Sequence, residues 1–133
     1  MGERNLEFAQ QWLEKARHDL FTARHVLDVP DGPTDTPCFH AQQVVEKVLK
    51  AILTASGVRF QPVHDLMPLL EQAVSRAPEL QRFREVCAQL SEYAVAVRYP
   101  GETDDPGREE AAEAVNAAQE ILSIGEACLA GMA

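Results

Sequence analysis

A polar stripe on one predicted helix could bind an anion. The stretch CFHAQQVVEKVLKAIL carries, at spacings of three, four and three residues, His40, Gln43, Lys47 and Lys50. On a helix these spacings place the four side chains within an arc of roughly 80°. Two ammonium groups near an imidazole and an amide could bind a phosphate and hydrogen-bond a base or a sugar. The alternatives are a solvated face, in which Glu46 pairs with Lys50 at i, i+4, and a contact between two copies of the chain.

A second candidate site closes the predicted fourth helix. Arg98 is suited to bidentate contact with a phosphate, and Tyr99 is suited to stacking on a base. Alternatively, Arg98 caps the last carbonyls of that helix and Tyr99 is a packing residue. The acidic residues that follow, Glu102, Asp104 and Asp105, are unfavourable for an anion site. They could instead pair with Arg98 or repel nonspecific RNA.

A third candidate is His64. Its imidazole could donate to a phosphate or act as an acid or a base near neutral pH. The alternative is a structural residue at the start of a helix, where Asp65 is the capping side chain. No serine or cysteine has the context of a nucleophilic triad, and the carboxylates form no pattern typical of a metal site. We therefore expect neither a bound metal nor a cofactor.

Composition limits the class of protein. The 133 residues fit one domain, residues 1–133, and a hydrophobic content of 46% is typical of a globular chain. The formal net charge of −9 disfavours general binding to DNA or RNA, although a small site for a nucleotide or one RNA strand remains possible. Charged residues stand where a signal peptide is apolar, and no apolar run could cross a membrane. We expect a cytoplasmic protein.

The elements that must position these residues are all helices. Apolar side chains recur at alternating spacings of three and four, with no sustained strand-like alternation. The sequence predicts four long helices and one short one, over residues 5–28, 36–57, 65–77, 78–98 and 105–129. The second helix is apolar over about half of its circumference, which predicts a central position. Short connections favour an all-α, up-and-down antiparallel four-helix bundle with an additional short helix.

Local signals mark the ends of these helices. Gly57 is a plausible C-terminal cap for the second helix. Three helices combine an N-cap residue with a proline in the first turn, namely Thr36 with Pro37, His64 or Asp65 with Pro68, and Asp105 with Pro106. Packing residues are expected among the cysteines and aromatics. We expect three buried cysteines, Cys38, Cys87 and Cys128. We expect four aromatic residues to lie in the core or at a dimer contact, namely Trp12, Phe21, Phe39 and Phe83.

Four blocks resemble the HEPN domain (higher eukaryotes and prokaryotes nucleotide-binding) in its small stand-alone prokaryotic form. They are WLEKARHDLFTA, FHAQQVVEKVLKAIL, HDLMPLL and YAVAVRYPG, in the order and spacing of that family and over nearly the whole chain. The resemblance implies a helical bundle that associates as a homodimer. It also implies one of three functions: a substrate-binding partner of a separately encoded minimal nucleotidyltransferase, a ribonuclease toxin restrained by such a partner, or a protein that simply binds nucleotides.

The preferred interpretation is a non-catalytic protein that binds a nucleotide, ATP or GTP, for a nucleotidyltransferase partner. The candidate nucleotide-binding residues are His40, Gln43, Lys47, Lys50, His64, Arg98 and Tyr99. A dimeric interaction module without a ligand is another alternative.

The ribonuclease alternative depends on a motif that catalytic HEPN domains carry near the start of the last helix: an arginine, four to six residues, then a histidine. In RYPGETDDPGRE no histidine follows Arg98 or Arg108. The spacing does occur elsewhere, as Arg59 and His64 in the loop before the third helix. That position departs from the family pattern, so the sequence favours a protein that is not a nuclease.

Overall fold

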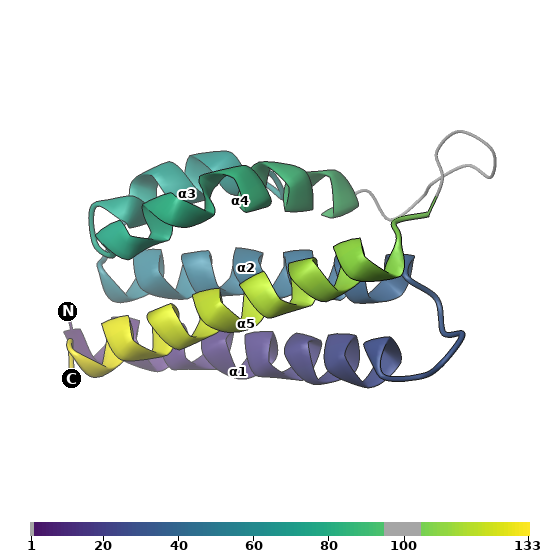
Figure 1. Ribbon diagram of the computed structural model, residues 1–133. Coiled ribbons are helices and arrows are strands. Elements are labelled where there is room, and N and C mark those ends of the chain that lie inside the picture. The colour runs from purple at the N-terminus through teal and green to yellow at the C-terminus, as the bar shows by residue number, and fades with distance from the viewer. Residues whose placement is uncertain (1, 95–104) are drawn as a thin grey trace.

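The computed structural model describes residues 2–94 and 105–133. Within these ranges the chain is helical and contains no strand. Five α-helices and two short 3₁₀ segments follow in the order α1 (Gly2–Leu27), α2 (Asp35–Ala55), α3 (Leu66–Val74), η1 (Pro78–Phe83), α4 (Arg84–Ser91), η2 (Glu92–Ala94) and α5 (Arg108–Ala130). Helices α1, α2, α4 and α5 alternate in direction, so both ends of the chain lie at the same end of the bundle (Figure 1). The predicted all-α, antiparallel bundle is confirmed.

Helix α2 lies at the centre of the molecule, as its wide apolar face predicts. It contacts α1 and α5 on one side and α3 and α4 on the other (Figure 1). More than half of its 21 residues are buried. The contact with α5 depends on a small residue, because a Cβ added at Gly125 would lie 2.6 Å from Cγ1 of Val48. The two helices therefore pack backbone to side chain at that point.

Helix ends agree with the sequence to within a few residues. Asp65 is the N-cap of α3, and its Oδ1 accepts a hydrogen bond from the Met67 amide at 3.0 Å. Gly57 has φ 70° just after α2, a conformation that favours glycine. The N-cap predictions for α2 and α5 were wrong, because these helices begin at Asp35 and at Arg108. The two prolines expected in the first turns still lie within two residues of these starts.

The predicted fourth helix is not one continuous α-helix. Residues 78–83 and 92–94 are wound as 3₁₀ helix, and only Arg84–Ser91 between them is α-helical. In a 3₁₀ helix residues i and i+3 lie on the same side, so both Leu80 and Phe83 face the core. The tighter winding therefore preserves the buried stripe that predicted the helix.

The predicted packing residues have mixed positions. Cys38, Cys87 and Phe83 are buried, whereas Cys128, Trp12 and Phe39 are half-buried. Phe21 is 74% exposed and stacks on His25 at a ring separation of 6.1 Å. A core position is therefore wrong for Phe21, and its role as a dimer contact stays a prediction. Over the described part of the chain, no helix is long and apolar enough to cross a membrane.

Candidate functional site

The predicted polar stripe of α2 is divided between two carboxylates. The first is Asp19 of α1, which binds two stripe residues at once. Oδ1 of Asp19 lies 2.9 Å from Nδ1 of His40, and Oδ2 accepts a hydrogen bond from the Lys47 ammonium. The Asp19 side chain is only 13% exposed. These two stripe residues therefore join α1 to α2 across the bundle, and the charge of Lys47 is already neutralised.

The second carboxylate belongs to Glu46, whose side chain is 5% exposed. Its Oε2 accepts a hydrogen bond from Nζ of Lys50 at 2.9 Å, the i, i+4 pair expected from the sequence. Its Oε1 lies 3.1 Å from Nε2 of Gln42 and 3.1 Å from Nδ1 of His64. Burial alone would raise the pKa of the Glu46 carboxyl, but hydrogen bonds from Lys50, Gln42 and His64 hold it below its ordinary value. Glu46 is therefore a buried, ionised acceptor at neutral pH.

Lys50 is enclosed by apolar and aromatic groups. Its side chain is 9% exposed, and its Nζ lies 5.4 Å from the ring centre of Trp12 and 5.9 Å from that of Phe60. An ammonium held this way is stabilised by the ring faces and by its carboxylate partner. It has little surface left for a ligand phosphate. Lys50 is thus better explained as part of a buried ion pair than as a nucleotide-binding residue.

His64 combines an exposed ring with a fixed position. Its side chain is 72% exposed, although its Nδ1 contacts the buried Glu46. Its backbone carbonyl accepts a hydrogen bond at 3.0 Å from Nε2 of Gln42, which is itself fully buried. The next two residues are held by Ser91, whose Oγ donates to Oδ1 of Asp65 at 3.3 Å and accepts from the Leu66 amide at 3.0 Å. The loop before α3 therefore presents one imidazole whose backbone and ring are both tied to α2.

Of the other predicted site residues that the structure describes, Gln43 contacts this cluster and Arg59 does not. Gln43 is half-buried and donates to Oε1 of Gln42 at 2.6 Å. Arg59 is exposed, and its backbone carbonyl accepts a hydrogen bond from Gln72 at 3.2 Å. Arg98 and Tyr99 lie outside the described residues, so their predicted roles stay predictions. In residues 2–94 and 105–133, no group of three or more His, Cys, Asp or Glu side chains could hold a metal ion.

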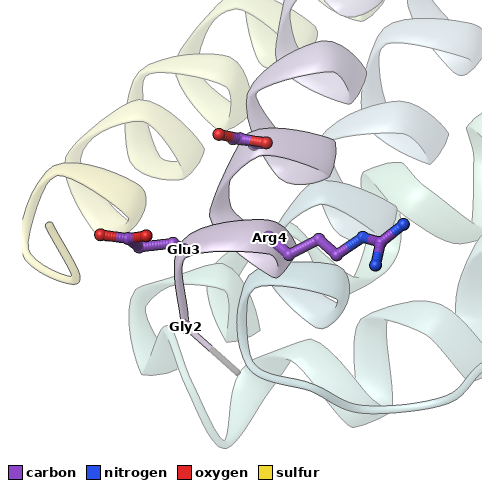
Figure 2. Close-up of a pocket in the computed structure, with 4 residues that line it drawn as sticks. Gly2, Glu3 and Arg4 are labelled. Atoms are coloured by element: carbon purple, nitrogen blue, oxygen red, sulfur yellow. The ribbon is translucent and has the colours of Figure 1, made fainter.

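Three hollows at the surface are lined by residues other than the predicted site residues. One hollow of about 670 Å³ lies at the start of α1 and is lined by Gly2, Glu3, Arg4 and Glu7. Figure 2 shows Glu3 and Arg4 pointing away from each other, so their charges do not converge on one ligand. A smaller hollow of about 210 Å³ is lined, further along α1, by Phe8, Gln11, Trp12 and Lys15. It presents aromatic rings beside an ammonium group.

Sequence reasoning missed Asp19 and the role of Gln42. At about 100° per residue, Gln42 falls between Leu49 and Leu53 around α2, inside the apolar arc. A polar side chain in that position must find a hydrogen-bond partner, so the pattern could have indicated a buried network. Asp19 gave no such signal, because it contacts residues 21 and 28 positions away on another helix.

Comparison with known proteins places the chain in a family. The family model described as HEPN domain matches residues 9–128. The chain belongs to the HEPN family. It is 27% identical to a protein of Methanocaldococcus jannaschii named "Putative toxin MJ1304", over 90% of this chain and 87% of that protein. The crystal structure of TT1696 from Thermus thermophilus is similar in fold, with a TM-score of 0.76 and 32% identity over 90% of this chain and 97% of that one.

For a HEPN protein, the observed site is chemically simple. Lys47 and Lys50, the two cations of the α2 stripe, are each paired with a carboxylate of the same chain. The mostly exposed side chain beside them is the imidazole of His64. An imidazole held by a buried carboxylate can exchange protons or donate and accept hydrogen bonds. The arrangement suits proton transfer better than tight electrostatic binding of an anion.

Proposed function

We propose that this HEPN protein is the toxin-class member of a two-protein system whose other member is a separately encoded minimal nucleotidyltransferase. The observation that carries the proposal is the similarity to the M. jannaschii protein named "Putative toxin MJ1304", which matches over 90% of the chain. In this proposal the chain acts on RNA, and the partner restrains it. Binding to a nucleotidyltransferase is common to the two leading roles that the family resemblance implies.

The geometry supports this role over nucleotide capture by the α2 stripe. Capture would require Lys47 and Lys50 to contact phosphate, yet each is paired with a carboxylate that is at most 13% exposed. Replacing such a partner by a phosphate would leave a buried carboxylate without its cation, which is costly. Proton transfer by His64, in contrast, requires no rearrangement of the described residues. The toxin role therefore uses the group that the fold leaves accessible.

Nucleotide binding remains a second candidate at a different place. The hollow lined by Phe8, Trp12 and Lys15 puts aromatic rings next to an ammonium group, the combination that stacks a base and binds a phosphate. Calorimetric titration with ATP and GTP tests this candidate. Saturable binding that Lys15→Ala loses and Arg76→Ala keeps supports it, because Arg76 is an exposed cation in the turn after α3, away from this hollow. No heat at millimolar nucleotide excludes it for the isolated chain.

The toxin proposal is tested by inducible expression of the full chain in a bacterial host. We expect growth arrest, relief of the arrest when a cognate nucleotidyltransferase is expressed with it, and purification of the two proteins as a complex. A well-folded protein that neither slows growth nor binds any such nucleotidyltransferase contradicts the proposal. A complex without growth arrest supports the alternative role, in which the chain binds substrate for its partner.

A further inference from the structure

The four histidines of the chain differ sharply in their surroundings. His18 is 73% exposed, and its Nε2 lies 3.5 Å from Glu14, whose side chain is itself 64% exposed. His25 stacks on the exposed ring of Phe21. His40 is 26% exposed, and it shares Asp19 with a lysine. His64 alone among the four combines a mostly exposed ring with a carboxylate that is almost completely buried.

The contact with Glu46 fixes the tautomer of His64. An ionised carboxylate can only accept hydrogen bonds, so Nδ1 of His64 must carry the hydrogen that joins the two groups. In the neutral ring Nε2 then has a free lone pair. The side chain as a whole is 72% exposed, and its contact with the carboxylate is made through Nδ1. The ring therefore presents a proton acceptor to whatever binds at this surface.

The surrounding hydrogen bonds hold this acceptor in place before any substrate arrives. Gln42 donates to the carbonyl of His64 at 3.0 Å and to the same Oε1 of Glu46 at 3.1 Å. Lys50 donates to the other carboxylate oxygen and neutralises its charge. Orienting a catalytic group in advance removes an entropic cost from the reaction. A histidine that served only to begin α3 would not need this support, because Asp65 already caps the helix.

We propose that His64 is the general base of an RNA-cleaving reaction and that Glu46 is its positioning residue, which rests on the proposed toxin role. Nε2 of His64 takes the proton of a ribose 2′-hydroxyl, and the 2′-oxygen forms a bond to the adjacent phosphorus. The bond from phosphorus to the 5′-oxygen breaks, and that oxygen takes a proton from water. The resulting hydroxide takes the proton back from His64. The products are a 2′,3′-cyclic phosphate and a 5′-hydroxyl.

This assignment differs from the arginine–histidine motif of catalytic HEPN domains, because His64 lies before α3 and not at the start of α5. The basic group of the same loop is Arg59, which is exposed and precedes His64 by five residues. A guanidinium is suited to binding phosphate, but no contact joins Arg59 to His64 or Glu46, so the proposal does not depend on it.

Two variants of the full chain separate a catalytic His64 from a structural one. His64→Ala removes the base, and we expect cleavage of total cellular RNA to fall by about 100-fold or more. His64→Asn keeps an N–H that can donate to Glu46 but has no titratable nitrogen, and we expect the same loss. The matched control is His18→Ala, which removes an equally exposed histidine and should leave cleavage unchanged. Thermal unfolding checks that each variant is folded.

The dependence of the cleavage rate on pH also separates the two roles, because a histidine with only a structural role would not set that dependence. A general base must be unprotonated, so the wild-type rate should rise with pH as the imidazole loses its proton. The ring contacts Glu46 of α2, whose other carboxylate oxygen binds Lys50, and Asp65 is the next residue in the chain. Glu46→Gln removes the carboxylate that accepts the Nδ1 hydrogen bond and orients the ring, so the maximal rate should fall.

Because Glu46→Gln leaves Lys50 without its partner, that variant could fail to fold, and nitrogen NMR of the wild type is a second test. We expect His64 to carry its hydrogen on Nδ1 at neutral pH. A hydrogen on Nε2, or full cleavage by His64→Asn, overturns the inference. Growth arrest without RNA cleavage overturns it too, and it leaves a toxin restrained by its partner but with a target other than RNA. A wild-type protein with neither activity overturns both.

Discussion

Replacing Lys50 with methionine tests the buried ion pair on which the candidate site depends. The substitution keeps the length and apolar character of the side chain but removes the ammonium that neutralises Glu46. Breaking a buried ion pair by removing one partner costs about 3–5 kcal/mol. Glu46 still receives hydrogen bonds from Gln42 and His64, so we expect the lower end, about 3 kcal/mol.

The reciprocal change, Glu46→Met, should cost more. It leaves the Lys50 ammonium without an acceptor in a site where only 9% of the side chain is exposed, and it removes the acceptor of two further donors. We expect about 4–5 kcal/mol. The double variant contains no buried charge at either position. Since apolar replacement of a buried pair is often neutral, we expect its free energy of unfolding to lie within about 2 kcal/mol of the wild type.

Urea unfolding of the four proteins at neutral pH measures these differences. The free energies of unfolding give a double-mutant cycle, and the midpoints should shift while the slopes stay constant. The expected values correspond to a coupling energy well above 1 kcal/mol, beyond what independent sites show. Additive single variants that each cost under about 1 kcal/mol would mean that water screens the pair, as at a protein surface. The assignment of Lys50 and Glu46 as a buried ion pair would then be wrong.

Further predictions test the packing, the thiols and the pH dependence. Gly125→Ala places a Cβ 2.6 Å from Val48, so it should lower the free energy of unfolding by about 1–3 kcal/mol despite the better helix propensity of alanine, as thermal unfolding would reveal. Burial raises the pKa of Cys87 to about 12, so a thiol-specific chromogenic reagent should modify the half-buried Cys128 well before Cys87 in the native protein. The pKa of Glu46 is lowered on folding, so its contribution to the free energy of unfolding is fully present above its ordinary pKa of 4.5. That contribution is lost as the pH falls through the pKa of the folded state. Acidification should therefore destabilise the wild type more than the double variant with methionine at positions 46 and 50. Light scattering should give twice the chain mass if the predicted homodimer forms.

Much of the fold could be predicted because helical periodicity reports the buried face directly. Helices α1 and α2 carry long apolar stripes, and Gly57 and Asp65 end and begin helices where the sequence predicts. The 3₁₀ segments around α4 could not be predicted in the same way. Leu80 and Phe83 are three residues apart, a spacing that fits both kinds of helix, so tertiary packing decides which one forms.

The candidate site was only partly predictable, for a different physical reason. Periodicity says which face of α2 a side chain occupies, but it does not say which residue of another helix lies opposite. His40 and Lys47 lie on the predicted stripe, yet their shared partner Asp19 is fixed by the packing of α1 against α2. The residue type of His64 alone predicts an acid or a base at that position. Its contact with Glu46 is what gives that choice a geometric basis.

The internal pairing of cations also limits how this chain can bind RNA. Lys47, Lys50 and Arg17 each pair with a carboxylate inside or across the bundle, and the chain carries a formal net charge of −9. Each RNA phosphate neutralised by a cation contributes about −0.7 to the logarithmic salt slope of single-strand binding. A monomer that contacts RNA phosphates through one or two cations, such as the exposed Arg59, should therefore bind RNA weakly and with little salt dependence. Tight binding requires a second surface, which a second copy of the chain or the partner protein would have to supply.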